Sequence, residues 1–158
     1  MSQLGFLTVL FGAGTPEMTA AGCAVLLAHA LFKATLFMVV GVIDRGAGTR
    51  DVRRLPPLGG RRWLAVKAVA VVAAASMAGV PLTFGFIAKE LGLAAVGYDA
   101  IGGAGLVLAG SVVGSSLTAA YAARFVAGGL GAFAGARPAA NRAAPPSVAF
   151  VAPAAGLA

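Results

Sequence analysis

Long apolar runs alternate with short polar segments along this chain. The apolar runs cover residues 2–14, 18–43, 63–96, 101–126 and 147–158. A helix of about 20 apolar residues crosses a bilayer core about 30 Å thick, so the second and fourth runs each fit one crossing, whereas the first and last are short. The pattern predicts an all-α membrane protein, an antiparallel bundle of transmembrane helices that we expect to be truncated at both ends.

The run 63–96 is too long for one straight crossing. As an unbroken helix it would extend about 51 Å at 1.5 Å per residue. The sequence Ser-Met-Ala-Gly-Val-Pro at residues 76–81 interrupts it. Because Pro81 lacks an amide hydrogen and its ring clashes with a carbonyl one turn back, and because Gly79 and Gly85 weaken the helix, we expect a broken helix. Irregular backbone at membrane depth must be buried in protein or face a wet cavity, and an interrupted span points to an ion site.

Composition supports the membrane class. Of the 158 residues, 59% are hydrophobic and 11% are charged, whereas a soluble domain carries about 25% charged residues. A soluble helical bundle could not bury this much apolar surface, and the alternation typical of barrel strands does not appear in the sequence. Cys23 is the single cysteine, so it cannot form an intramolecular disulfide.

The net charge of +7 is concentrated in two polar segments. Residues 44–62 contain six arginines and residues 127–146 contain two, whereas the other turns carry Glu17 and Asp99 and no basic residue. By the positive-inside rule, both basic segments are expected to be cytoplasmic loops of a multi-pass membrane protein. We expect this membrane to be the plasma membrane. Trp63 is expected to be an aromatic anchor at the inner interface. This distribution favours a lipid bilayer, and not nucleic acid, as the partner.

Two lysines, Lys33 and Lys89, lie deep inside apolar runs, whereas Lys67 lies one turn from the start of its run and can extend to the headgroups. A charge at the bilayer centre costs roughly 3 kcal/mol on insertion scales, so a charge kept there is by default part of an ion or proton path. His29 and Lys33 are spaced i, i+4 and share one helix face, and histidine titrates near neutral pH. The pair is therefore a candidate two-step proton relay. The alternatives are a static lysine that caps a helix–helix contact and a histidine held by a structural hydrogen bond.

Lys89 and Glu90 follow the expected helix break directly. A local ion pair is one interpretation, but adjacent helical residues point about 100° apart and do not face each other. We therefore expect Lys89 to face inward and Glu90 to find another partner. Gly110 and Gly114 form a small-xxx-small pair, which is typical of helix packing. The sequence contains no metal-ligand cluster, nucleophile–base pair or phosphate loop, so we expect no metal, no cofactor and no enzymatic activity.

Two stretches of the sequence resemble a known family. His29 to Arg53, HALFKATLFMVVGVIDRGAGTRDVR, closely resembles the large A subunit of Mrp-type multisubunit cation/proton antiporters, and so does SMAGVPLTFGFIAKE at residues 76–90. More distantly, the pattern is similar to the antiporter-like subunits of proton-pumping NADH:quinone oxidoreductase. The stretch from Asp44 to Arg53 favours the Mrp group. The resemblance covers roughly residues 2–92.

This resemblance implies roles for particular residues. In the family, the histidine and lysine matching His29 and Lys33 belong to a hydrophilic axis along the membrane. The lysine matching Lys89 lies on a discontinuous helix at the end of a proton half-channel. We accordingly expect His29, Lys33, Lys89 and Glu90 on a proton pathway that drives exchange of a monovalent cation, with Na⁺ as the expected cation and other membrane subunits as partners. Val25 stands where the family typically has a further histidine.

The favoured interpretation treats residues 1–158 as a fragment of one transmembrane antiporter-like domain. The family's glutamate–lysine pair on earlier helices has no match in this chain, so we expect the complete path to need further spans. One alternative is an antiporter-like, proton-translocating subunit of a redox-driven pump, whose redox partner would lie on other chains. The other alternative is an inactive truncated fragment that inserts in the membrane and transports nothing.

Overall fold

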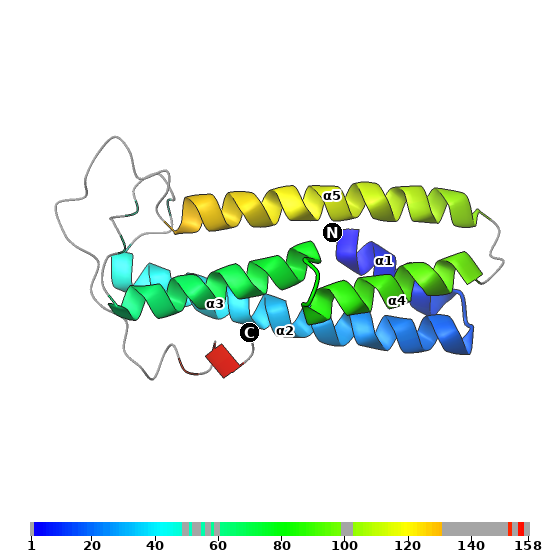
Figure 1. The fold of residues 1–158 in the computed structure, drawn as a ribbon, viewed down its shortest axis with the longest axis horizontal. Helices are drawn as coiled ribbons and strands as arrows, with labels where there is room; N and C mark the ends of the chain where they lie inside the picture. The colour runs from blue at the N-terminus through cyan, green and yellow to red at the C-terminus, as the bar shows by residue number, and fades with distance from the viewer. Residues whose placement is uncertain are drawn as a thin grey trace. The chain divides into compact units, whose positions relative to one another are not determined.

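The computed structural model describes residues 2–48, 51, 55, 58, 61–98, 103–130, 152, 155 and 156, without the side chains of Ser2 and Arg62. Within this part of the chain there are five helices (Figure 1): α1 (Ser2–Gly12), α2 (Pro16–Ala47), α3 (Arg61–Ala78), α4 (Phe84–Tyr98) and α5 (Ala104–Gly129). None of the described residues is in a strand, and the predicted all-α class is confirmed.

Threonines fix the starts of two helices. Thr15 precedes α2, and its hydroxyl accepts a hydrogen bond from the Met18 amide at 3.3 Å. Pro16 follows at the first helical position, where the missing amide hydrogen is not needed. Thr83 precedes α4, and its hydroxyl accepts from the Phe86 amide at 3.3 Å. Both helices therefore begin next to a threonine whose hydroxyl accepts from an amide of the first turn.

Two of the described helices, α2 and α5, are long and apolar enough to cross a membrane, whereas Gln3–Gly12 and Trp63–Ala78 are shorter apolar helices. Helix α2 extends past the predicted run to Ala47, and α3 begins at Arg61, so both ends of the expected loop 44–62 are helical. The expected connection 127–146 begins inside α5, which ends at Gly129. Beyond residue 130, that connection and the run 147–158 lie outside the described residues, apart from 152, 155 and 156.

The chain divides into two compact units, one made of residues 1–30 and 75–121 and the other of residues 31–74 and 122–158. In the first unit, the buried positions of α1 and α2 recur every three or four residues, as one helix face requires. They are Leu7, Leu10, Met18, Ala21, Val25 and Ala28. Helices α1 and α4 also approach each other closely in this unit. A Cβ atom built on Gly92 of α4 would lie 2.7 Å from the Phe6 ring of α1.

The second unit has a core around Trp63. Its buried members come from α2, from the segment before α3 and from α3 itself: Val39, Val42, Ile43, Leu55, Leu58, Trp63, Val66 and Ala70. Trp63 is 1% exposed, and its indole nitrogen is buried without a hydrogen-bond partner among the described residues. The prediction of an interfacial anchor at Trp63 is therefore wrong, because the ring fills a protein core.

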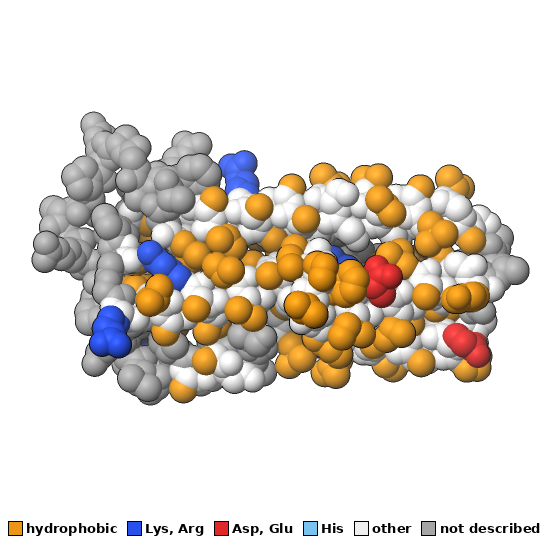
Figure 2. Space-filling view, viewed as in Figure 1, with side chains coloured by type: hydrophobic (Ala, Val, Ile, Leu, Met, Phe, Trp, Pro, Cys, Tyr) orange, Lys and Arg blue, Asp and Glu red, His pale blue; other side chains and the backbone are white. Residues whose placement is uncertain are grey.

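Large apolar side chains also cover much of the surface, and Figure 2 shows them across the visible face. Monomeric soluble proteins rarely expose contiguous apolar patches of such extent. This exposure fits the predicted membrane protein, in which lipid or neighbouring helices cover the apolar surface. The exposed apolar residues on α3 and α5 include Leu64, Val71, Val72, Leu106, Val112, Val113 and Leu117.

Candidate functional site

The chain leaves helical geometry between α3 and α4, at residues 79–83. Gly79 has a positive φ of 83°. Its amide donates to the Ser76 carbonyl at 3.2 Å, and the Val80 amide donates to the Ala75 carbonyl at 3.0 Å. This pair of bonds is the Schellman arrangement, which ends a helix at a left-handed glycine. The predicted broken helix is thus confirmed at this position.

Pro81 lies beyond the end of α3 and does not interrupt its hydrogen bonding. The helix already ends at Ala78, so the expectation that the Pro81 ring breaks a continuing helix is wrong in mechanism. A proline just past a helix end is common because it cannot continue the helix. Leu82 follows with a φ of 72°, the one positive φ of a non-glycine residue in the described part. A conformation of this kind costs about 1–3 kcal/mol.

Gly85 brings the first turn of α4 directly against the last turn of α3. Its amide donates to the Ser76 hydroxyl at 3.2 Å, and a Cβ atom at this position would overlap the Ser76 carbonyl oxygen. The Ser76 side chain therefore satisfies one of the amides at the start of α4 that lack an acceptor within the helix. Gly85 is needed here for close approach, whereas the sequence suggested only a weakened helix.

Lys89 closes the break from the α4 side. Its amine, Nζ, donates to the Met77 carbonyl at 3.0 Å and to the Ala78 carbonyl at 3.1 Å. Both carbonyls belong to the end of α3, where the helix offers them no amide partner. The negative end of the α3 dipole also favours a cation at this place. The structure thus brings together Lys89 and Gly79, whose built Cβ atom would lie 3.2 Å from the Lys89 amine.

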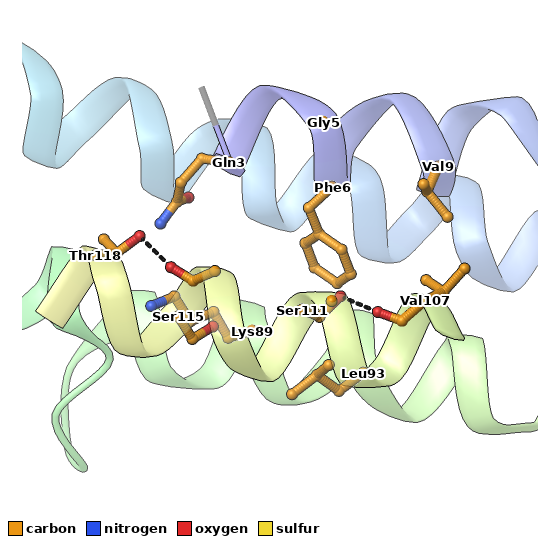
Figure 3. Close-up of a pocket in the computed structure, with 12 residues that line it drawn as sticks. Gln3, Gly5, Phe6, Val9, Lys89, Leu93, Val107, Ser111, Ser115 and Thr118 are labelled. Carbon is orange, nitrogen blue, oxygen red and sulfur yellow. Dashed lines mark hydrogen bonds between the residues drawn. The ribbon is translucent and has the colours of Figure 1, made fainter. Parts of the chain in front are cut away.

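The same amine borders a cavity of about 280 Å³ in the first unit, between α1, α4 and α5. Figure 3 shows Gln3, Ser115, Thr118 and the Lys89 amine toward one end of this cavity and Phe6, Val9 and Leu93 toward the other. An apolar hollow with a few convergent polar groups is the usual form of a binding or transport site. The amine of Lys89 therefore has backbone carbonyls at the end of α3 and a partly polar space beside it.

Three hydroxyl residues of α5 line this cavity: Ser111, Ser115 and Thr118. The sequence pattern alone did not distinguish them. Their spacing of i, i+4 and i+7 places them on one helix face, and that spacing was the available signal. Hydroxyl residues are common in membrane helices, so their spacing alone does not indicate a site. It does so only once the facing helix is known, which here is α4 with Lys89.

The other predicted pathway residues lie on α2 and on the exposed face of α4. His29 and Lys33 are one turn apart on α2 and both are partly buried. The Nδ1 atom of His29 is buried. Glu90 is exposed on α4 and does not line the cavity that Lys89 borders. Val25, the position at which the family resemblance suggests a further histidine, is 2% exposed in the core of the first unit.

Comparisons with known proteins show which family the chain resembles. The family described as "NADH:quinone oxidoreductase/Mrp antiporter, TM" matches residues 1–118. A probable A/B subunit of a K(+)/H(+) antiporter of Rhizobium meliloti is 47% identical over 92 residues, which are 58% of this chain and 9% of that protein. The putative antiporter protein mnhA2 of Staphylococcus haemolyticus is 53% identical over 72 residues, which are 45% of this chain and 9% of that protein.

A solved structure gives the same picture. The Mrp complex from Dietzia sp. DQ12-45-1b contains a chain that is 39% identical to this one, with a TM-score of 0.79. The match covers 98% of this chain and 16% of that chain, so these residues correspond to a small part of a longer membrane protein. The resemblance to the large Mrp-type antiporter component is confirmed, and the chain belongs to the transmembrane family shared by NADH:quinone oxidoreductases and Mrp antiporters.

Proposed function

We propose that this chain is the proton-conducting part of a multisubunit monovalent cation/proton antiporter. In this proposal the protein is a multi-pass protein of the plasma membrane, with the basic segments 44–62 and 127–146 on the cytoplasmic side. Protons and Na⁺ are the exchanged ions. The Rhizobium meliloti relative is named as part of a probable K(+)/H(+) antiporter, so K⁺ is the second candidate cation.

The placement of Lys89 carries the proposal. Its amine donates to the Met77 and Ala78 carbonyls at a helix break and borders the cavity of the first unit. Discontinuous helices at membrane depth present unpaired backbone groups to ions and substrates. A lysine at such a place can release its proton to the cavity while the carbonyls continue to hold the neutral amine. Lys89 is therefore proposed as a proton carrier.

His29 and Lys33 of α2 are proposed as further proton carriers. They lie one helical turn apart, a spacing at which side chains on one helix face meet. A neutral imidazole both accepts and donates, so it can pass a proton on to a neighbouring amine. Glu90 is also proposed as a residue of the proton pathway. Its side chain is exposed on α4, so it would exchange protons with a group that is not among the described residues.

The test uses the full-length protein in its assembled complex, reconstituted in vesicles. Cation-dependent proton flux is measured for wild type and for Lys33→Ala, Lys89→Ala and Lys89→Arg, each with Na⁺ or K⁺ as the cation. Arginine keeps a positive donor for the Met77 and Ala78 carbonyls but does not release its proton. We expect Lys89→Arg to assemble normally and to lose flux. Wild-type flux in all three variants would exclude the proposed proton path.

A second candidate function follows from the family description, which also covers NADH:quinone oxidoreductases. In that case the chain would pass protons for a redox-driven pump. Adding NADH to vesicles without a cation gradient distinguishes the antiporter from the pump. The antiporter moves no protons under these conditions and does so only when Na⁺ or K⁺ is supplied. Proton uptake driven by NADH alone and blocked by a quinone-site inhibitor would favour the pump.

A further inference from the structure

The cavity beside Lys89 carries a row of hydroxyl groups to which the proposed function assigns no part. We propose that this cavity holds a chain of water molecules, and that Ser115 of α5, flanked by Ser111 and Thr118, extends the proton path from the Lys89 amine. The proposal rests on the proposed function of Lys89. All of its residues belong to the first unit.

The face of α5 that borders the cavity is made of small residues. Gly110 and Gly114 line the cavity together with the three hydroxyl residues. The sequence suggested that this glycine pair serves close helix packing, yet a Cβ atom built on Gly110 meets no atom within 4 Å. At Gly110, therefore, the absence of a side chain keeps space open on the face that carries the hydroxyl groups.

The hydroxyl groups differ in what they can still do. The Ser111 hydroxyl donates to the Val107 carbonyl at 2.7 Å, and the Thr118 hydroxyl donates to the Gly114 carbonyl at 2.7 Å. Each has used its single hydrogen, so its oxygen can act only as an acceptor. Ser115 makes no hydrogen bond within the described part of the chain. Its hydroxyl can both accept and donate, as a proton relay requires.

The space and the polar groups fit water. A cavity of about 280 Å³ has room for several molecules at about 30 Å³ each. Water in a protein interior makes about three hydrogen bonds, and the amide of Gln3, the Lys89 amine and the Ser115 hydroxyl provide partners toward one end (Figure 3). A protonated amine at Lys89 can pass its proton to the first water, and Ser115 then continues the chain.

The first experiment measures whether water reaches this face. In the assembled complex, with Cys23 and all other cysteines replaced, single cysteines are introduced as Ser115→Cys and Ser116→Cys. Ser116 is the matched control because it is the next residue on α5 but does not line the cavity. It lies on the exposed surface of the helix, which lipid or neighbouring helices cover in the membrane. A charged, water-soluble methanethiosulfonate reagent modifies only a hydrated, ionised thiol. We expect labelling at 115 to exceed labelling at 116 by about tenfold.

The second experiment measures cation-dependent proton flux at equal amounts of assembled complex. We expect Ser115→Ala to lower the flux about fivefold, the factor that corresponds to one lost hydrogen bond, and Ser115→Thr to restore it. Ser116→Ala keeps the wild-type flux. Gly110→Leu is a second route to the same result, because its side chain enters open space and displaces the water.

The outcomes separate this proposal from the proposed function. If Lys89→Ala abolishes flux while Ser115→Ala and Gly110→Leu keep it, and the thiol at 115 resists the reagent, then lipid or another helix fills the cavity and the water path is wrong. If Lys33→Ala, Lys89→Ala and Lys89→Arg all keep wild-type flux, the proposed function itself is wrong. Loss of flux in Lys89→Ala and Ser115→Ala, with labelling at 115, supports both.

Discussion

Gly85 of α4 packs directly on Ser76 of α3, with its amide donating to the Ser76 hydroxyl at 3.2 Å and no room for a Cβ atom beside the Ser76 carbonyl. This contact joins the two helices on either side of the break. The contact also fixes the position of the first two turns of α4. Lys89 lies there, one helical turn after Gly85. The position of the Lys89 amine therefore depends on a glycine that carries no chemistry of its own.

Gly85→Ala is expected to destabilise the protein by about 1–3 kcal/mol, the usual range for overpacking. The added methyl group overlaps backbone atoms of Ser76, which cannot move without shifting the end of α3. Thermal unfolding of the purified protein in detergent measures the effect. Gly97→Ala is the matched control, because it lies on the same helix with no atom within 4 Å of a built Cβ. Gly97→Ala should be neutral or stabilising by about 0.5–1 kcal/mol. Equal melting temperatures for the two variants would contradict the packing described here.

Gly92 and Phe6 should show energetic coupling in a double-mutant cycle. A Cβ atom on Gly92 would lie 2.7 Å and 2.8 Å from two carbon atoms of the Phe6 ring. We expect Gly92→Ala to cost about 1–3 kcal/mol in the wild-type background, and clearly less when Phe6 is already replaced by leucine, whose side chain is smaller and more flexible. The interaction energy, from the four melting curves, should reach at least about 0.5 kcal/mol. Strict additivity would show that the two side chains do not meet.

The amino-acid sequence predicted the break but not how it is closed. Gly79 marked the interruption correctly, because its positive φ ends α3 through local backbone geometry, whereas Pro81 lies beyond that end. The inward direction of Lys89 was also expected, because Lys89 and Glu90 are adjacent on a helix and point about 100° apart. Its partners were not, because the Met77 and Ala78 carbonyls become available only once the first turn of α4 packs on the last turn of α3. Trp63 shows the same limit, since its place in a core depends on residues distant in sequence.

Gly79→Ala is expected to weaken the α3 end through the backbone. A φ of 83° is sterically unfavourable for alanine, and its methyl group would lie 3.2 Å from the Lys89 amine. Forcing a non-glycine residue into this conformation costs about 1–2 kcal/mol. Leu82→Gly is the informative counterpart, because Leu82 already has a positive φ and an exposed side chain. Its relieved strain offsets the added chain entropy, so little change in melting temperature is expected. A larger loss for Leu82→Gly than for Gly79→Ala would argue against the backbone geometry of the break.

Lys89→Met separates the structural part of Lys89 from its proposed transport part. Methionine keeps much of the aliphatic chain but leaves the Met77 and Ala78 carbonyls without the donor at 3.0 Å and 3.1 Å. Leaving partly buried acceptors unsatisfied costs about 1–3 kcal/mol, so we expect a lower melting temperature together with the loss of proton flux. Lys89→Arg keeps donors at this place and should recover stability without recovering flux. The comparison needs both readouts on the same preparation: if Lys89→Arg recovered stability and flux together, the lysine would serve only as a cap for α3, and the proton would have to travel by another route.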